Sequence, residues 1–156
     1  DWSDYRVIPD CFKSWSLNKS VLIRSPNSTR PWQHVLEVLS GYLTFAANLD
    51  KKSQLNGEVF NFGPRKSQDK RVIDVIRKIK KHLTGFKWTI KKNQTFKESK
   101  LLKLNSSKAW KRLKWSNKLS FNETLKMTSE WYETFYNKKD IINFTLNQIR
   151  EFEKKL

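Results

Sequence analysis

The chain has 156 residues, of which 37% are hydrophobic, 13% aromatic and 30% charged, and its formal net charge is +17. This composition indicates one globular domain over residues 1–156 and excludes a disordered tail. The sequence has neither the roughly 20 consecutive apolar residues of a membrane span nor an apolar secretion signal at its start. Cys11 is the single cysteine, and we expect a cytoplasmic protein with no membrane partner.

The positive charge is concentrated in the middle of the chain. Residues 61–120 contain 19 basic and 3 acidic residues, whereas the flanking segments are close to neutral. Clustered cations indicate binding of nucleic acid or another polyanion. An excess of lysine on solvated faces is the alternative, and we favour it because lysines outnumber arginines 24 to 8. A nucleic-acid partner is therefore the less favoured interpretation.

Helical and extended patterns alternate in the first half of the chain. Apolar residues at helical spacing predict helices over residues 4–17 and 36–49, and Gly41 in the second implies close packing. A β-branched run predicts a short strand at 21–24. An alternating run bounded by glycines and a proline predicts another strand at 57–64. This alternation is typical of the α/β class.

The second half is richer in predicted helices. An amphipathic pattern predicts a helix over residues 72–83, and weaker strand patterns follow at 87–90 and 101–104. Capping residues mark the starts of three later helices, of which the second extends to about residue 136. They are Ser106, the capping box of Ser120 and Glu123, and the similar pair of Thr145 and Gln148.

The common catalytic and cofactor motifs are missing from the sequence. It has no GxGxxG, P-loop, GxSxG, HExxH or Tyr-x-x-x-Lys, and no Cys/His spacing suited to a metal. His34 and His82 are the two histidines, and a lone histidine is more often structural than catalytic. We therefore expect no catalytic, cofactor-binding or metal-ligating residues in this chain.

The most informative segment joins the first strand to the second helix, at residues 23–37. Arg30 follows a turn and precedes Pro31, which stiffens the backbone. The planar fork of an arginine suits bidentate binding of phosphate. A salt bridge to a nearby acid is the alternative.

Residues 30–37 (RPWQHVLE) and 39–43 (LSGYL) resemble a signature of the CDP-glucose 4,6-dehydratase family, which is part of the extended short-chain dehydrogenases/reductases. Three positions depart from the family pattern, with Lys114 in place of a glycine, Leu101 of an aromatic residue and Asn105 of an aspartate. Further strings match the family in the same order along nearly the whole chain. They are DWSDYRVIPD at 1–10, GEVFNFGP at 57–64, LKL at 102–104, SKA at 107–109, EWY at 130–132 and FTL at 144–146.

The resemblance implies a helix-rich α/β fold with a few short strands, the C-terminal substrate-binding part of an extended Rossmann-type protein. Members of the family are NAD-dependent lyases that convert CDP-glucose to CDP-4-keto-6-deoxyglucose, used for deoxysugars of surface polysaccharides such as lipopolysaccharide O-antigen. The NAD-binding N-terminal half, with the catalytic residues, is expected to be absent from this chain, which alone is expected to be inactive. The full enzyme is expected to be a homo-oligomer.

The resemblance also implies which residues bind the nucleotide-sugar. Arg6 and Arg30 match positions that contact the diphosphate. Charge-assisted bonds from arginine forks suit such an anion. The weaker candidates are Arg24 and His34 in the nucleotide wall, and Gln33 and Asn61 as amide hydrogen-bond partners.

Two other functions compete with this interpretation. The charge of residues 61–120 suits a non-enzymatic nucleic-acid-binding module, and a stand-alone sugar-nucleotide-binding protein would bind CDP without another half. If the N-terminal half is missing, the helix at 36–49 and the strand near Phe60 would lack cover for their apolar faces. We therefore expect poor solubility or self-association.

Overall fold

The computed structural model describes residues 2–3, 5–64, 69–90 and 101–156 of the chain. The described part is rich in helix and has a few short strands, which confirms the predicted α/β class. In chain order the elements are α1 (Val7–Ser16), β1 (Ser20–Ile23), β2 (Thr29–Pro31), α2 (Val35–Lys51), the 3-10 helix η1 (Ser53–Leu55), β3 (Asp69–Arg71), α3 (Val72–His82), β4 (Lys87–Ile90), α4 (Ser107–Leu113), α5 (Phe121–Tyr136) and α6 (Ile141–Glu153).

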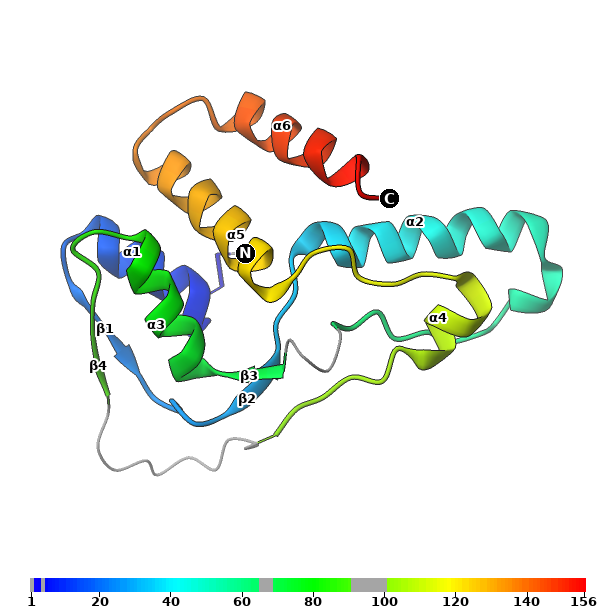
Figure 1. Cartoon of the computed structure of the whole chain (residues 1–156), viewed down its shortest axis with the longest axis horizontal. Helices are drawn as coiled ribbons and strands as arrows, with labels where there is room; N and C mark the ends of the chain where they lie inside the picture. The colour runs from blue at the N-terminus through cyan, green and yellow to red at the C-terminus, as the bar shows by residue number, and fades with distance from the viewer. Residues whose placement is uncertain (1, 4, 65–68, 91–100) are drawn as a thin grey trace.

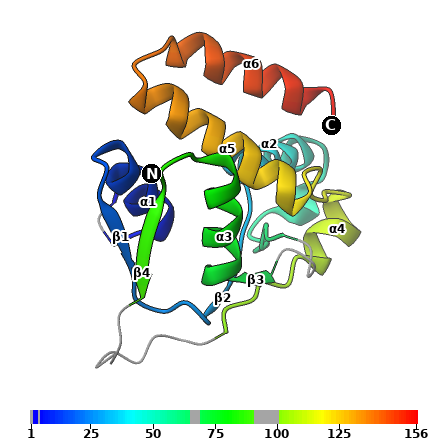
Figure 2. The ribbon, with the colours of Figure 1, turned by 60° about the vertical axis from the view of Figure 1, so that its left-hand side comes forward.

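These elements form two parts that meet at the start of α2 (Figure 1). One part contains the strands with α1, α3, α5 and α6, and the other contains α2, η1 and α4. β1 pairs with β4 in parallel, with Ser20 opposite Lys87, and β2 pairs with β3 antiparallel, with Arg30 opposite Lys70. Figure 2 shows α3 beside the β1–β4 pair, with α5 crossing above α3 and α6 lying outside α5.

The main core forms where α1, α3 and α5 meet the β1–β4 pair. Val75, Ile76 and Ile79 of α3 are fully buried, as the amphipathic pattern of this helix predicts. Phe12 of α1 stacks on Tyr132 of α5 with ring centroids 4.6 Å apart. Burial of each such side chain contributes about 1.5–3 kcal/mol, and this packing fixes α1 and α5 relative to each other.

A second, smaller core joins α2 to α4 and to the segment at 57–64. Phe62 and Trp115 form an edge-to-face pair in it, with ring centroids 5.1 Å apart. The Phe62 ring occupies the space that a Cβ on Gly41 would need. The close packing that Gly41 implied is therefore confirmed.

Most predicted elements of the first 90 residues are confirmed. The helices at 4–17, 36–49 and 72–83 correspond to α1, α2 and α3, and the strands at 21–24 and 87–90 to β1 and β4. Asp4, where the first helix was expected to begin, lies outside the described residues. Later in the chain, the capping box is also confirmed, because the Glu123 N–H donates to Ser120 Oγ at 3.2 Å and the Ser120 N–H donates to Glu123 Oε2 at 2.7 Å.

Two predicted strands are wrong. The described residues of 57–64 and 102–104 belong to no strand, and Leu101 forms only an isolated bridge to Thr29. The alternating pattern at 57–64 has another cause, because Phe60 and Phe62 pack on the second core while Asn61 between them is exposed. An alternating pattern indicates that one face of a segment is buried, whatever covers it. Here helices cover that face in place of a neighbouring strand.

Ser106 is the N-cap residue of α4, as predicted, whereas the helix start predicted at Thr145 is wrong. The Ser106 hydroxyl makes no capping bond to α4, because it accepts the Gly63 N–H at 2.7 Å. Asn105 Oδ1 accepts the Ser107 N–H at 3.0 Å and serves the helix start instead. The final helix begins at Ile141, not at Thr145, since Asp140 Oδ1 accepts the Asn143 N–H at 3.0 Å.

Candidate functional site

A cavity of about 860 Å³ lies among α1, the two strands that follow it, α5 and α6. Its wall includes the start of α1, β1 with its following turn, β2, the start of α2, and one side each of α5 and α6. Five of the six predicted site residues line this cavity. They are Arg6, Arg24, Arg30, Gln33 and His34.

Local structure explains why three arginines reach one cavity. Arg6 is the N-cap residue of α1 with an extended backbone, and Arg24 directly follows β1. Arg30 is the middle residue of β2, is half-buried, and donates from Nη1 to the Thr29 carbonyl at 2.9 Å. Asp10 supplies the one carboxylate among the described lining residues. The wall thus carries three guanidinium groups against one carboxylate, a charge that favours an anionic ligand.

Gln33 and His34 are anchored within the protein. Gln33 donates from Nε2 to the Phe62 carbonyl at 2.8 Å, which ties β2 to the second core. His34 caps α2, because its Nδ1 accepts the Leu36 N–H at 3.4 Å. Burial lowers the pKa of His34 to about 4, so the ring is neutral at pH 7. Both residues therefore shape the cavity wall from fixed positions.

The sixth predicted site residue, Asn61, lies away from the cavity. Asn61 is exposed on the segment that packs against α2, and it is not among the residues that line the cavity. Trp32 both lines the cavity and packs against the main core, and its Nε1 donates to the Lys70 carbonyl at 2.8 Å. His82 is exposed at the end of α3.

Sequence reasoning missed the wall that α5 and α6 form. Thr124 and Thr128 of α5 line the cavity together with Thr145 and Gln148 of α6. Trp131 joins the two helices by donating from Nε1 to Thr145 Oγ1 at 2.9 Å. The spacing of i, i+4 on α5 and i, i+3 on α6 places each pair on one helix face, and this spacing was the available signal.

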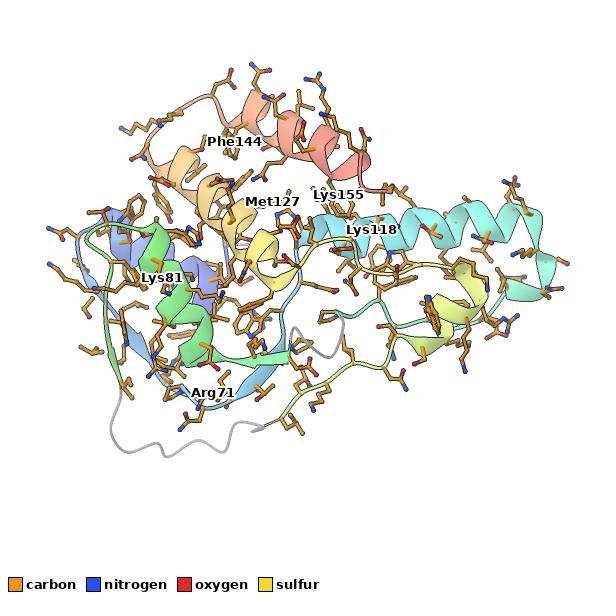
Figure 3. The ribbon with its side chains drawn as sticks, viewed as in Figure 1. Arg71, Lys81, Lys118, Met127, Phe144 and Lys155 are labelled. Carbon is orange, nitrogen blue, oxygen red and sulfur yellow. The ribbon has the colours of Figure 1, made fainter. Side chains whose placement is uncertain are left out.

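Several basic residues of the segment at 61–120 form ion pairs within the protein. Arg112 binds Glu58 at 2.8 Å, and Lys108 binds the same carboxylate. Arg71 binds both oxygens of Asp74 at 3.0 Å. Figure 3 shows Arg71, Lys81 and Lys118 well apart in the molecule. None of the arginines and lysines described in this segment lines the cavity.

The described residues lack both a metal-binding cluster and a membrane-spanning helix. They contain no group of three or more His, Cys, Asp or Glu side chains that could hold a metal ion. No helix in the same ranges is long and apolar enough to cross a bilayer.

Solved structures of low sequence identity show which fold the chain has. UDP-glucuronic acid 4-epimerase from Bacillus cereus matches 85% of this chain with a TM-score of 0.70 and 20% identity, over 41% of its own chain. An epimerase from Methanothermobacter thermautotrophicus matches with a TM-score of 0.72 and 20% identity, over 87% of this chain and 40% of its own. dTDP-glucose 4,6-dehydratase from Bacillus anthracis matches with a TM-score of 0.63 and 17% identity, over 86% of this chain and 41% of its own. The chain has the fold of the C-terminal part of extended short-chain dehydrogenases/reductases.

The sequence gives a more specific relationship. The chain is 35% identical, over 97% of its length, to CDP-glucose 4,6-dehydratase from Salmonella typhimurium, and it spans 43% of that protein. No protein-family model matches the chain. The chain is thus a relative of the C-terminal part of a CDP-glucose 4,6-dehydratase, and the resemblance predicted from residues 30–43 is confirmed.

Proposed function

We propose that this chain is the CDP-sugar-binding portion of a CDP-glucose 4,6-dehydratase, which converts CDP-glucose to CDP-4-keto-6-deoxyglucose with NAD. The observation that carries the proposal is the meeting of Arg6, Arg24 and Arg30 at one cavity. The relationship to a CDP-glucose 4,6-dehydratase supports the choice of nucleotide.

The shape and charge of the cavity suit such a ligand. Its volume of about 860 Å³ lies within the range of small-molecule sites, roughly 300–1,000 Å³. A diphosphate brings about two negative charges, and Arg6 and Arg30 can each supply two parallel, charge-assisted hydrogen bonds to it. Arg30 is best placed for this role, because its own strand and the bond to Thr29 hold its side chain.

The redox step of this reaction would depend on NAD bound elsewhere. NAD supplies hydride transfer when it is bound. Dinucleotide sites use a glycine-rich turn between a strand and a helix, and the described two-stranded sheets contain no such turn. The described residues therefore provide no dinucleotide site of this kind. We assign them the binding and orientation of the nucleotide-sugar, and we propose that the chain alone does not catalyse the reaction.

Titration of the purified chain with CDP, followed by calorimetry, tests the proposal. Arg30→Ala should weaken binding by roughly 10- to 100-fold, because a charge-assisted bidentate contact is lost. Arg150→Ala is the matched control, since Arg150 is exposed on α6 and is not among the residues that line the cavity. Equal affinity of both variants, or no CDP binding by the unchanged chain, would contradict the proposal.

The same samples test the nucleic-acid alternative. A module that binds RNA through residues 61–120 should show a steep salt dependence and retain its affinity in Arg30→Ala. The contacts of Arg71, Lys108 and Arg112 with acidic side chains already account for part of the charge in this segment. Tight RNA binding combined with no affinity for CDP would favour the alternative function.

A further inference from the structure

Tyr5 lines the cavity with a backbone conformation and a solvent exposure that are unusual for an aromatic residue. Its backbone φ is 63°, in the left-handed region that side chains other than glycine disfavour. Its side chain is 79% exposed although it contributes to the cavity wall. Strained backbone positions occur preferentially where a side chain is aimed at a ligand.

Arg24 covers one face of the Tyr5 ring. Its guanidinium carbon lies 4.8 Å from the ring centroid, which is within the range of a cation–π contact. Arg24 directly follows β1, whose ladder with β4 fixes the backbone there. The pair presents a flat surface, an aromatic ring backed by a planar cation, at the edge of the cavity.

The other aromatic residues of the cavity wall are already packed. Tyr132 is 6% exposed and stacks on Phe12. Trp131 stacks on Phe135 with ring centroids 5.8 Å apart. Trp32 packs against the main core and is bonded to the Lys70 carbonyl. Of the four aromatic residues that line the cavity, Tyr5 has by far the most open ring surface.

We propose that Tyr5 is the residue on which the base of a bound nucleotide stacks, with Arg24 positioning the Tyr5 ring. This inference rests on the proposed function. A nucleoside diphosphate has a charged part that suits Arg6 and Arg30, and a flat base whose π-face suits an exposed aromatic ring. Stacking accepts any base, so Tyr5 distinguishes a nucleotide from a bare diphosphate.

Two ligands and three variants of the whole chain test this role. CDP and inorganic pyrophosphate are titrated into the unchanged chain, Tyr5→Ala and Tyr5→Phe. Tyr5→Ala should weaken CDP binding roughly tenfold, whereas Tyr5→Phe should stay within about twofold, because the ring remains. Pyrophosphate binding should be the same in all three. Trp110→Ala removes an aromatic residue that is 60% exposed and lies outside the cavity wall, and it should change the binding of neither ligand.

The outcomes separate this inference from the proposed function. If Arg30→Ala weakens CDP binding while Tyr5→Ala does not, the nucleotide site stands and the role of Tyr5 is wrong. An equal loss of CDP and pyrophosphate in Tyr5→Ala also overturns stacking. If the unchanged chain binds neither CDP nor pyrophosphate, both the proposed function and the role of Tyr5 are overturned.

Discussion

The buried carboxylate of Glu37 accepts the backbone N–H of Leu119 at 2.6 Å. It also accepts the Lys118 N–H at 2.9 Å, so one α2 side chain binds the two peptide groups that precede the N-cap of α5. Beside this contact, Trp115 donates from Nε1 to Ser40 Oγ at 3.0 Å. These bonds connect α2 to the segment that leads into α5, and both helices line the cavity. The Glu37 contact therefore fixes one cavity wall relative to the other.

Glu37→Gln should destabilise the protein by about 2–4 kcal/mol. The amide keeps one acceptor oxygen, but it loses the negative charge and presents an NH2 group to backbone donors in a buried site. Urea denaturation followed by tryptophan fluorescence measures the loss. Glu130→Gln is the control, since Glu130 is 44% exposed in a long contact with Lys126, and its loss should stay below about 0.5 kcal/mol. Equal effects of the two changes would contradict the role of Glu37.

Lys114 occupies the position where the family pattern has a glycine, and it ends α4 with φ of 58° and ψ of 20°. A lysine in this left-handed conformation costs roughly 1 kcal/mol relative to glycine. Lys114→Gly should therefore raise the free energy of unfolding by about 0.5–1 kcal/mol. Lys111→Gly, within the same helix, should lower it by a similar amount. Thermal melts of both variants would give opposite shifts, and a shared sign would contradict this interpretation.

Helices with one apolar face could be predicted well from the sequence. The apolar spacing of α3 and the capping box of α5 are local properties, and both are confirmed. β2 and β3 were not predicted, because three-residue strands such as Thr29–Pro31 carry no alternation. The two strands form by pairing with each other, with Arg30 opposite Lys70, which lies 40 positions further along the chain. Such a long-range contact leaves no local pattern.

The arginine side of the cavity could be predicted because a resemblance supplied the positions. Tyr5 and the α5–α6 wall were not predicted. The spacing of Thr145 and Gln148 places them on one helix face, but no local pattern indicates that this face packs beside α5 at a cavity. The burial of Glu37 could not be predicted from the sequence either. Its partners are backbone N–H groups about 80 residues away, which any sequence would supply.

The buried ring of His34 should make stability depend on pH. Burial lowers its pKa to about 4 from 6.5, so the unfolded chain binds this proton more tightly than the folded chain. The free energy of unfolding should be insensitive to His34 above pH 6.5. It should fall as the pH drops from 6.5 towards 4, by about 3 kcal/mol at most. Carboxylates with lowered pKa values, such as Glu123 with a pKa of about 2, affect the free energy of unfolding mainly below pH 4.5.

His34→Asn separates this effect from the loss of a helix cap. Asparagine is a good N-cap residue and has no proton to gain in this range, so the variant should lose the slope between pH 6.5 and 4.5. His82→Asn changes the exposed histidine and should keep the slope. Urea midpoints at pH 7, 6, 5 and 4.5 provide the measurement. A slope that persists in His34→Asn would assign the pH dependence to other groups.

The outer face of α2 is apolar and exposed. Val35, Leu39, Tyr42 and Leu43 lie on it with exposed fractions of 61%, 46%, 57% and 72%. The inner face of the same helix packs on the second core, so α2 has more apolar surface than the described residues cover. We expect the isolated chain to self-associate through this face, with a sedimentation coefficient that rises with protein concentration.

Changing Leu39 and Leu43 together to lysine should return the chain to a monomer. The two positions are four residues apart on one helix face, and their exposure means that the change removes little core packing. Ile142 and Leu146 are a matched control, because they have the same spacing on α6 and exposures of 71% and 43%. Lysines at those two positions should leave the association unchanged. A concentration-independent monomer for the unchanged chain, or equal loss of association in both double variants, would show that α2 is not the associating surface.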